Sequence, residues 1–171
     1  EIQVGTSDDS SEKHPSDADL SIRLFNAPPA NMQSNLLFPL RLAPAGSADF
    51  KKKLNTKNRK IVSDFPIIVH ETHPTAWKRW AKAARMGLPD TAKVTRLDSM
   101  IAVVRAAQRG IGAALVPVPV GELWFKEGSV VRLFKDEYVA DVSYYLVCPK
   151  DRAEDESVRL LRDWIVQNFA E

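Results

Sequence analysis

The residues most suited to chemistry in this sequence are the two histidines of the segment His70-Glu71-Thr72-His73. Zinc proteases place two histidines four residues apart on a helix, so that both rings reach one metal ion. Here the histidines are three residues apart, at the end of an expected strand and just before Pro74. We therefore favour structural or ligand-contacting histidines over a zinc site, and we predict no metal ligand and no cofactor.

Two glycines, Gly110 and Gly112, have the spacing that opens a dinucleotide-binding fingerprint. That fingerprint requires a strand, then the glycines, then a helix. Here a helical pattern comes first, and Leu115 stands where the third glycine belongs. A helix end at Gly110 explains the pattern better. Cys148 lies in an apolar segment and is expected in the core. No catalytic residue is predicted, so a binding module is the default.

The element expected to position a binding site is the segment 96–117, RLDSMIAVVRAAQRGIGAALVP. Asp98 can cap a helix start and Gly110 can end that helix. The apolar positions between them recur at helical spacing: Met100, Ile101, Val103, Val104 and Ala107. Residues 112–116 form an apolar run bounded by Pro117, typical of a strand buried on both faces. The start of such a helix lies at the carboxyl edge of the sheet, where α/β folds bind ligands.

Hydrophobic patterning along the rest of the chain predicts alternating strands and helices, which defines an α/β protein. Further strands are expected at residues 19–25, 36–43, 66–71, 94–97, 130–134 and 142–148, and further helices at 48–54, 75–86, 121–126 and 155–169. Two of these strands end at prolines, Pro44 and Pro149. If the two strands lie side by side, the chain leaves one lobe at the first and returns at the second.

Composition is ordinary for a globular protein, and the 24 basic and 22 acidic residues leave a net charge of only +2. That balance argues against a nucleic-acid surface. Trp77 and Trp80, set among basic residues, favour an amphipathic helix with its tryptophans inward, and the basic residues of 51–60 favour a solvated face. No apolar run has membrane-spanning length, and the single cysteine fits a reducing compartment. We expect a cytoplasmic location and no membrane contact.

Several segments together resemble LysR-type transcriptional regulators, in the branch that includes the glycine-cleavage activator. They are DLSIR (19–23), RLDS (96–99), AAQRGIGAALVP (106–117), SYYLVCPKDR (143–152) and VRLLRDWI (158–165). The resemblance implies a two-lobe, type II periplasmic-binding-protein-like fold with two crossover strands. Residues 1–44 and 148–171 would form lobe I, and 45–147 lobe II. The family's DNA-binding domain, and the first strand and helix of its effector domain, would precede Glu1, so the first lobe is expected to be incomplete.

The same resemblance places nine residues around an effector in the cleft between the lobes. They are Arg23, Phe25, Ala45, His70, Asp98, Ser99, Met100, Pro117 and Tyr145. Amides and the Ser99 hydroxyl at a helix start can hold a carboxylate or another anion, and Arg23 can add a charge-assisted hydrogen bond. Asp98 would repel an anion, and its capping role is at least as well supported.

The function implied is that of the effector-sensing and oligomerisation domain of a bacterial regulator. Its expected partners are a small-molecule effector, a further copy in a homodimer or homotetramer, and DNA only through the missing domain. A solute-binding protein of the same two-lobe fold is the alternative. An enzyme on that scaffold is less favoured, because only His70 and Glu71 could supply an acid–base pair and fold alone does not establish activity.

Overall fold

The computed structural model describes residues 2–6, 13–89 and 93–170. The chain divides into two compact units, one formed by residues 1–40 and 140–171 and the other by residues 41–139. Strands β2 (Met32–Gly46) and β9 (Tyr138–Pro149) each contribute residues to both units. The expected lobe boundaries, after residue 44 and before residue 148, fall in these same strands. The assignment of the units as effector-domain lobes stays a prediction.

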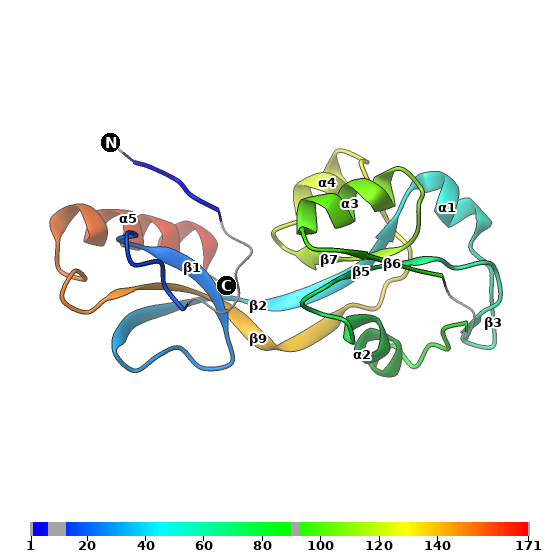
Figure 1. Ribbon diagram of the computed structural model, residues 1–171, viewed down its shortest axis with the longest axis horizontal. Helices are drawn as coiled ribbons and strands as arrows, with labels where there is room; N and C mark the ends of the chain where they lie inside the picture. Colours follow the sequence, from blue (N-terminus) through cyan, green and yellow to red (C-terminus); the bar gives the residue numbers. More distant parts are fainter. Residues whose placement is uncertain (1, 7–12, 90–92, 171) are drawn as a thin grey trace. The chain divides into compact units, whose positions relative to one another are not determined.

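The first unit packs one helix on a small antiparallel sheet. Strand β1 (Ser21–Phe25) pairs antiparallel with β9, which lies beside β2. Helix α5 (Glu156–Phe169) lies beside this sheet (Figure 1). Its Ile165 and Val166 pack against the buried side chains of the sheet. The predicted helix is confirmed, although Trp164 and Phe169 on its apolar stripe are about half exposed, at 55% and 51%.

The second unit is built on parallel strands. Strand β5 (Ile67–His70) pairs in parallel with β6 (Val94–Leu97) and is bridged through Ile67 to Ala113, just before β7 (Ala114–Val118). The second half of β2 pairs antiparallel with β7 and with β8 (Val131–Arg132). Figure 1 shows helices α2 (Ala76–Ala83) and α3 (Met100–Gln108) on opposite sides of these strands. The α/β class is confirmed.

Three short elements complete this unit. Helix α1 (Ala48–Lys53) confirms the helix expected at 48–54, and its N-cap is Ser47, whose Oγ accepts from the amide of Phe50 at 3.1 Å. The hairpin of β3 (Thr56–Lys57) and β4 (Lys60–Ile61) follows it. Helix α4 (Glu122–Lys126) lies between β7 and β8 in the chain.

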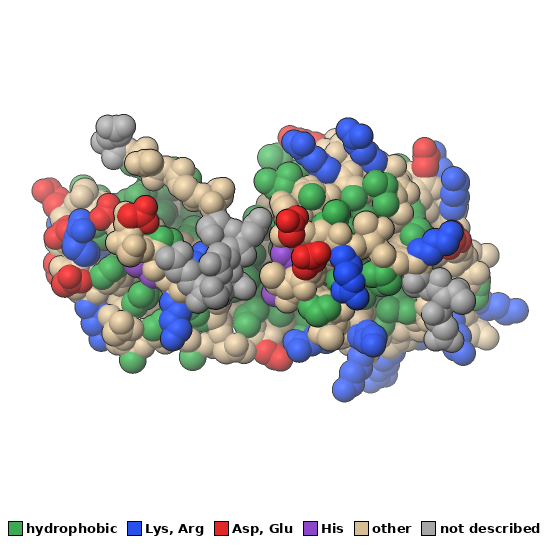
Figure 2. Space-filling model, viewed as in Figure 1, with side chains coloured by type: hydrophobic (Ala, Val, Ile, Leu, Met, Phe, Trp, Pro, Cys, Tyr) green, Lys and Arg blue, Asp and Glu red, His purple; other side chains and the backbone are tan. Residues whose placement is uncertain are grey.

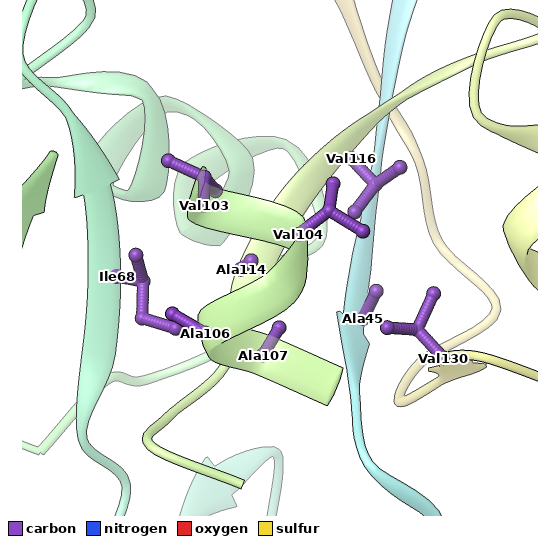
Figure 3. Packing of buried hydrophobic residues seen from close by; sticks show 9 residues of the cluster. All are labelled: Ala45, Ile68, Val103, Val104, Ala106, Ala107, Ala114, Val116 and Val130. Carbon is purple, nitrogen blue, oxygen red and sulfur yellow. The ribbon is translucent and has the colours of Figure 1, made fainter. Parts of the chain in front are cut away.

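The core of this unit has one layer on each side of the strands. On the α3 side, helix residues interlock with strand residues (Figure 3): Ala45, Ile68, Val103, Val104, Ala106, Ala107, Ala114, Val116 and Val130. On the α2 side, Trp77 and Trp80 meet edge to face with ring centroids 5.5 Å apart. Their exposed fractions are 3% and 0%, which confirms that the tryptophans of this helix face inward.

Of the three prolines expected at strand ends, Pro149 ends β9 as predicted, whereas the other two lie inside their strands. Pro44 lies inside β2, opposite Leu115, and Pro117 lies inside β7, opposite Leu42. A proline removes only one donor from the ladder and keeps its carbonyl. The Pro44 carbonyl accepts from the amide of Leu133 at 2.9 Å, so β2 continues to Gly46.

The predictions for the start and the end of α3 had different outcomes. The predicted Asp98 cap is wrong, because the N-cap residue is Ser99 in an extended conformation. The Gly110 stop is confirmed: its φ is +76°, which glycine adopts without steric cost. The amides of Gly110 and Ile111 donate to the carbonyls of Ala107 and Ala106, at 3.0 and 3.1 Å, in a Schellman motif.

Candidate functional site

The carboxyl ends of the parallel strands of the second unit form the candidate site. His70 ends β5 and pairs with Leu97 at the end of β6, and the chain then enters α3 through Ser99. The Glu71 amide donates to the Leu97 carbonyl at 2.9 Å, which fixes the turn after β5 beside the start of the helix. Four predicted residues from two distant segments therefore lie at one edge: His70, Asp98, Ser99 and Met100.

A small pocket opens at this edge, within the second unit. Its volume is about 20 Å³, room for about one ordered water molecule or a group of similar size. The lining side chains come from β2, β5, β7, α2, α3 and the turn between β5 and α2, and they are mainly apolar: Leu42, Ile68, Val69, His70, His73, Ala76, Trp77, Met100, Val103 and Leu115. Imidazole rings supply its only titratable side chains.

His70 is held by the turn that follows it. The Thr72 hydroxyl lies 2.9 Å from Nδ1 of His70, and the Thr72 amide donates to the same nitrogen at 3.3 Å. Because Nδ1 accepts, we assign the ring proton to Nε2, which leaves Nε2–H as a donor for a bound molecule. The ring is half-buried, so a ligand can reach it without displacing the core.

His73 is a second histidine of the pocket, and the sequence argument did not include it among the nine expected effector contacts. Its amide donates to the His70 carbonyl at 2.9 Å, and the two ring centroids are 5.7 Å apart. Partial desolvation of the ring, followed by the charges of His70 and Arg79, lowers the pKa of His73 below its ordinary value. The His73 ring therefore favours its neutral form more than a fully solvated imidazole does. Within the described part of the chain, no group of three or more His, Cys, Asp or Glu could hold a metal ion.

Trp77 lines the pocket and is held in place by contacts with its neighbours. Its Nε1 donates to the carbonyl of Ile68 at 3.0 Å, and its ring stands perpendicular to Phe65 with centroids 5.6 Å apart. The sequence placed this tryptophan in the core without connecting it to the site. The signal was its position on a helix that follows His70 by only a few residues.

The start of α3 offers donors. The first amides of a helix have no acceptor within the helix, and they carry the positive end of its dipole. The Ser99 hydroxyl makes no capping hydrogen bond with the first turn of the helix. Asp98 is exposed beside them, where its carboxylate opposes binding of an anion.

Three predicted residues meet in the first unit instead. Arg23 on β1 lies opposite Tyr145 on β9, and Phe25, two residues further along β1, is on the same face. The rings of Phe25 and Tyr145 have centroids 6.3 Å apart. All three side chains are half-buried, so they form a patch with an aromatic and a cationic component.

Ala45 and Pro117 are both buried in the second unit. Ala45 has an exposed fraction of 0% and packs between Ala114 of β7 and Arg132 of β8. Pro117 is buried within β7, and its carbonyl accepts from the Gly121 amide at 2.8 Å. Both belong to inner strands of the sheet, so their side chains fill the core. Their contact with an effector stays a prediction.

A cluster of charged side chains near this edge was not predicted from the sequence. Arg132 pairs with Glu137 and, at 3.3 Å, with Glu122, while Arg41 Nε lies 3.7 Å from Glu137. The Arg132 guanidinium also stacks 4.7 Å from the centroid of the Phe125 ring. Arg41 lies opposite Val118, the last residue of β7. The members come from four separate segments, so no spacing in the sequence signals them.

Comparison with known proteins decides the family. The profile of the LysR substrate binding domain matches residues 1–170. The chain belongs to this family. AmpR of Pseudomonas aeruginosa, an HTH-type transcriptional activator, is 33% identical over 97 residues, which are 55% of this chain and 32% of AmpR. AmpR of Enterobacter cloacae is 30% identical over 94 residues, which are 54% of this chain and 32% of that protein. The matches thus cover about a third of the length of these relatives.

Solved structures of LysR regulators share the fold. The AmpR effector binding domain from Citrobacter freundii superposes with a TM-score of 0.72 at 20% identity, covering 87% of this chain and 73% of that one. Full-length LysG from Corynebacterium glutamicum, with bound effector Arg, superposes with a TM-score of 0.63 at 18% identity, covering 89% and 51%. The periplasmic-binding-protein-like fold expected from the sequence is confirmed.

Membership in the LysR substrate binding domain family supports an effector-sensing regulatory domain rather than a solute-binding protein. None of the helices in the described residues is long and apolar enough to cross a membrane.

Proposed function

We propose that this LysR substrate binding domain senses a small molecule through the edge formed by β5 and α3. The observation that carries the proposal is the pocket in which His70 and His73 meet Met100 and Trp77 beside the start of α3. An apolar group of the effector would enter the pocket, and the Nε2–H of His70 would donate to a polar atom. The α3 amides and the Ser99 hydroxyl favour an effector that carries a carboxylate.

The roles of Arg23, Phe25 and Tyr145 as effector contacts stay predictions, as does the assignment to the glycine-cleavage-activator branch. In the whole protein, we infer that effector binding biases the orientation of dimeric or tetrameric subunits, whose separate domains would contact DNA in the cytoplasm. Such a bias can be no larger than the difference in effector affinity between the two states. The proposed role is that of a sensor and not of an enzyme.

A thermal-shift screen of amino acids and aromatic acids tests the proposal, since binding to the native state raises the melting temperature. Arginine belongs in the panel, because it is the effector bound in the LysG structure. For any hit, isothermal titration should show about tenfold weaker binding in the His70→Gln and Ser99→Ala variants, about 1.4 kcal/mol each. Lys150→Gln, an exposed position in the other unit, is the matched control.

Two results would overturn the proposal. A ligand that binds with unchanged affinity to both site variants does not use this edge. If no amino acid or aromatic acid shifts the melting temperature, the effector class is wrong. The regulator role has its own test, because the complete gene product should bind DNA in a sequence-specific manner.

A further inference from the structure

The charges of this chain are segregated between its two units. Residues 41–139 contain 18 Lys and Arg against 9 Asp and Glu, a net charge of +9. The other unit contains 6 against 13, a net charge of −7. The overall value of +2 conceals this asymmetry, which is a signature of proteins with a polyanionic partner. Figure 2 shows Lys and Arg side chains gathered over the part of the surface formed by α1, α2 and the β3 strand.

Two basic segments that are distant in the sequence meet on this surface. The Arg59 guanidinium, in the turn of the β3–β4 hairpin, donates to the carbonyls of Ala84 and Arg85 after α2, at 2.6 and 3.2 Å. The Gly87 amide donates to the Arg59 carbonyl at 2.8 Å, and Lys60 is bridged to Gly87. The hairpin is therefore fastened to the end of α2. We define the basic surface as five exposed residues: Lys57, Lys60, Lys78, Lys82 and Arg85.

The backbone holds like charges together on the basic surface. Lys57 and Lys60 are directly opposite each other across the hairpin, an arrangement that destabilises a strand pair. Lys78 and Lys82 are four residues apart on α2, where like charges also repel. Among the residues that the structure describes, none of these four ammonium groups has an ion-pair partner. Between residues 48 and 89 there are ten Lys and Arg and only three Asp and Glu.

We propose that the basic surface binds the phosphate backbone of duplex DNA. Phosphates spaced along a duplex would relieve the repulsion within both lysine pairs and release condensed counterions. Single-stranded nucleic acid is disfavoured, because it requires exposed aromatic rings for stacking and Trp77 and Trp80 are buried. A lipid surface is also disfavoured, because the outer face of α2 has no large apolar side chain to insert into a membrane. This contact adds to any DNA contact made by another domain and is independent of the effector site.

Fluorescence anisotropy of this chain with a labelled duplex of arbitrary sequence, from about 50 to 200 mM salt, tests the proposal. The logarithm of affinity should fall with the logarithm of salt with a slope of about −0.9 per phosphate contacted. The Lys57→Gln/Lys60→Gln and Lys78→Gln/Lys82→Gln variants should each flatten that slope by about 1.8. Their loss of affinity over this salt range should then be about tenfold smaller than that of the parent.

The matched control is Lys150→Gln/Arg159→Gln, which removes the same charge from exposed positions of the acidic unit. It should keep the parental slope. The proposal is wrong if the parent does not bind the duplex at low salt, or if the control flattens the slope as much as the two lysine variants. It is equally wrong if the parent prefers a single strand or phosphatidylserine vesicles. If sedimentation shows that the lysine variants abolish self-association instead, the partner is a second copy, attracted by its acidic unit.

Discussion

Replacing Gly112 by alanine should destabilise the second unit strongly, because the chain passes too close to Pro66 for a side chain to fit. A Cβ atom at this position would lie 2.6 Å from the carbonyl oxygen of Pro66 and 3.0 Å from its carbonyl carbon. Both atoms belong to the backbone, so no side-chain rotation relieves the clash. The backbones of β5 and β7 must therefore move apart to make room for the added Cβ atom.

The cost follows from the hydrogen bonds at this junction. The Ala113 amide donates to the Pro66 carbonyl at 2.8 Å, and the Ile68 amide donates to the Ala113 carbonyl at 2.7 Å. Overpacking costs about 1–3 kcal/mol, and weakening two hydrogen bonds adds about 1 kcal/mol each. The free energy of unfolding should fall by about 3–5 kcal/mol, a large share of the roughly 5–15 kcal/mol typical of a domain. The melting temperature should fall by about 6–20 °C.

Urea unfolding followed by tryptophan fluorescence measures this loss, because Trp77 and Trp80 are buried in the same unit. Gly128→Ala is the control: its φ is +71°, yet nothing lies within 4 Å of an added Cβ. The control should lose only about 1–2 kcal/mol through backbone strain. If Gly112→Ala is no more destabilising than Gly128→Ala, the close approach of the two strands is not what requires glycine.

Three further predictions concern side chains with contrasting surroundings. Ser47→Ala should lower the free energy of unfolding in urea by about 1 kcal/mol, because the Ser47 Oγ caps α1. Ser99→Ala should lower it by less than about 0.5 kcal/mol, because the Ser99 hydroxyl makes no capping hydrogen bond. Equal losses would contradict the assigned caps. Since the pKa of His73 is lowered in the folded state, its contribution to stability is full above about pH 6.5 and is lost as pH falls through its folded value. His73→Gln should flatten the pH dependence of the urea midpoint between about pH 7.5 and 5, and an unaltered profile would refute the shift. Burial raises the pKa of the Cys148 thiol, so a disulfide reagent should label Cys148 slowly in the native protein and rapidly in guanidinium. Fast labelling of the native protein would contradict the burial of this thiol.

Features governed by local geometry were predictable. The end of α3 at Gly110 and the Ser47 cap follow from residue preferences within a single turn. The inward face of α2 follows from its helical period, which aligns Trp77 with Trp80. Each of these features depends on neighbours a few residues away, so the sequence contains the necessary information.

Features governed by a distant strand were not predictable. Pro44 and Pro117 suggested strand ends, but each lies inside a ladder that its partner strand continues. Asp98 and Ser99 are both good caps, and the pairing of His70 with Leu97 decides where β6 ends and the helix begins. Pairing partners far along the chain set these boundaries.

The candidate site divides in the same way. By itself, the sequence determined the residue types at the ends of β5 and β6, including His70, Ser99 and Met100, because strands that alternate with helices end at one edge of a sheet. Only the tertiary structure decided that His73 and Trp77 share a pocket with Met100. Only the tertiary structure joined the lysines of the hairpin to those of α2, through Arg59. The physical reason is that hydrophobic periodicity specifies which face of an element is buried, whereas side-chain contacts between elements depend on how their backbones pack.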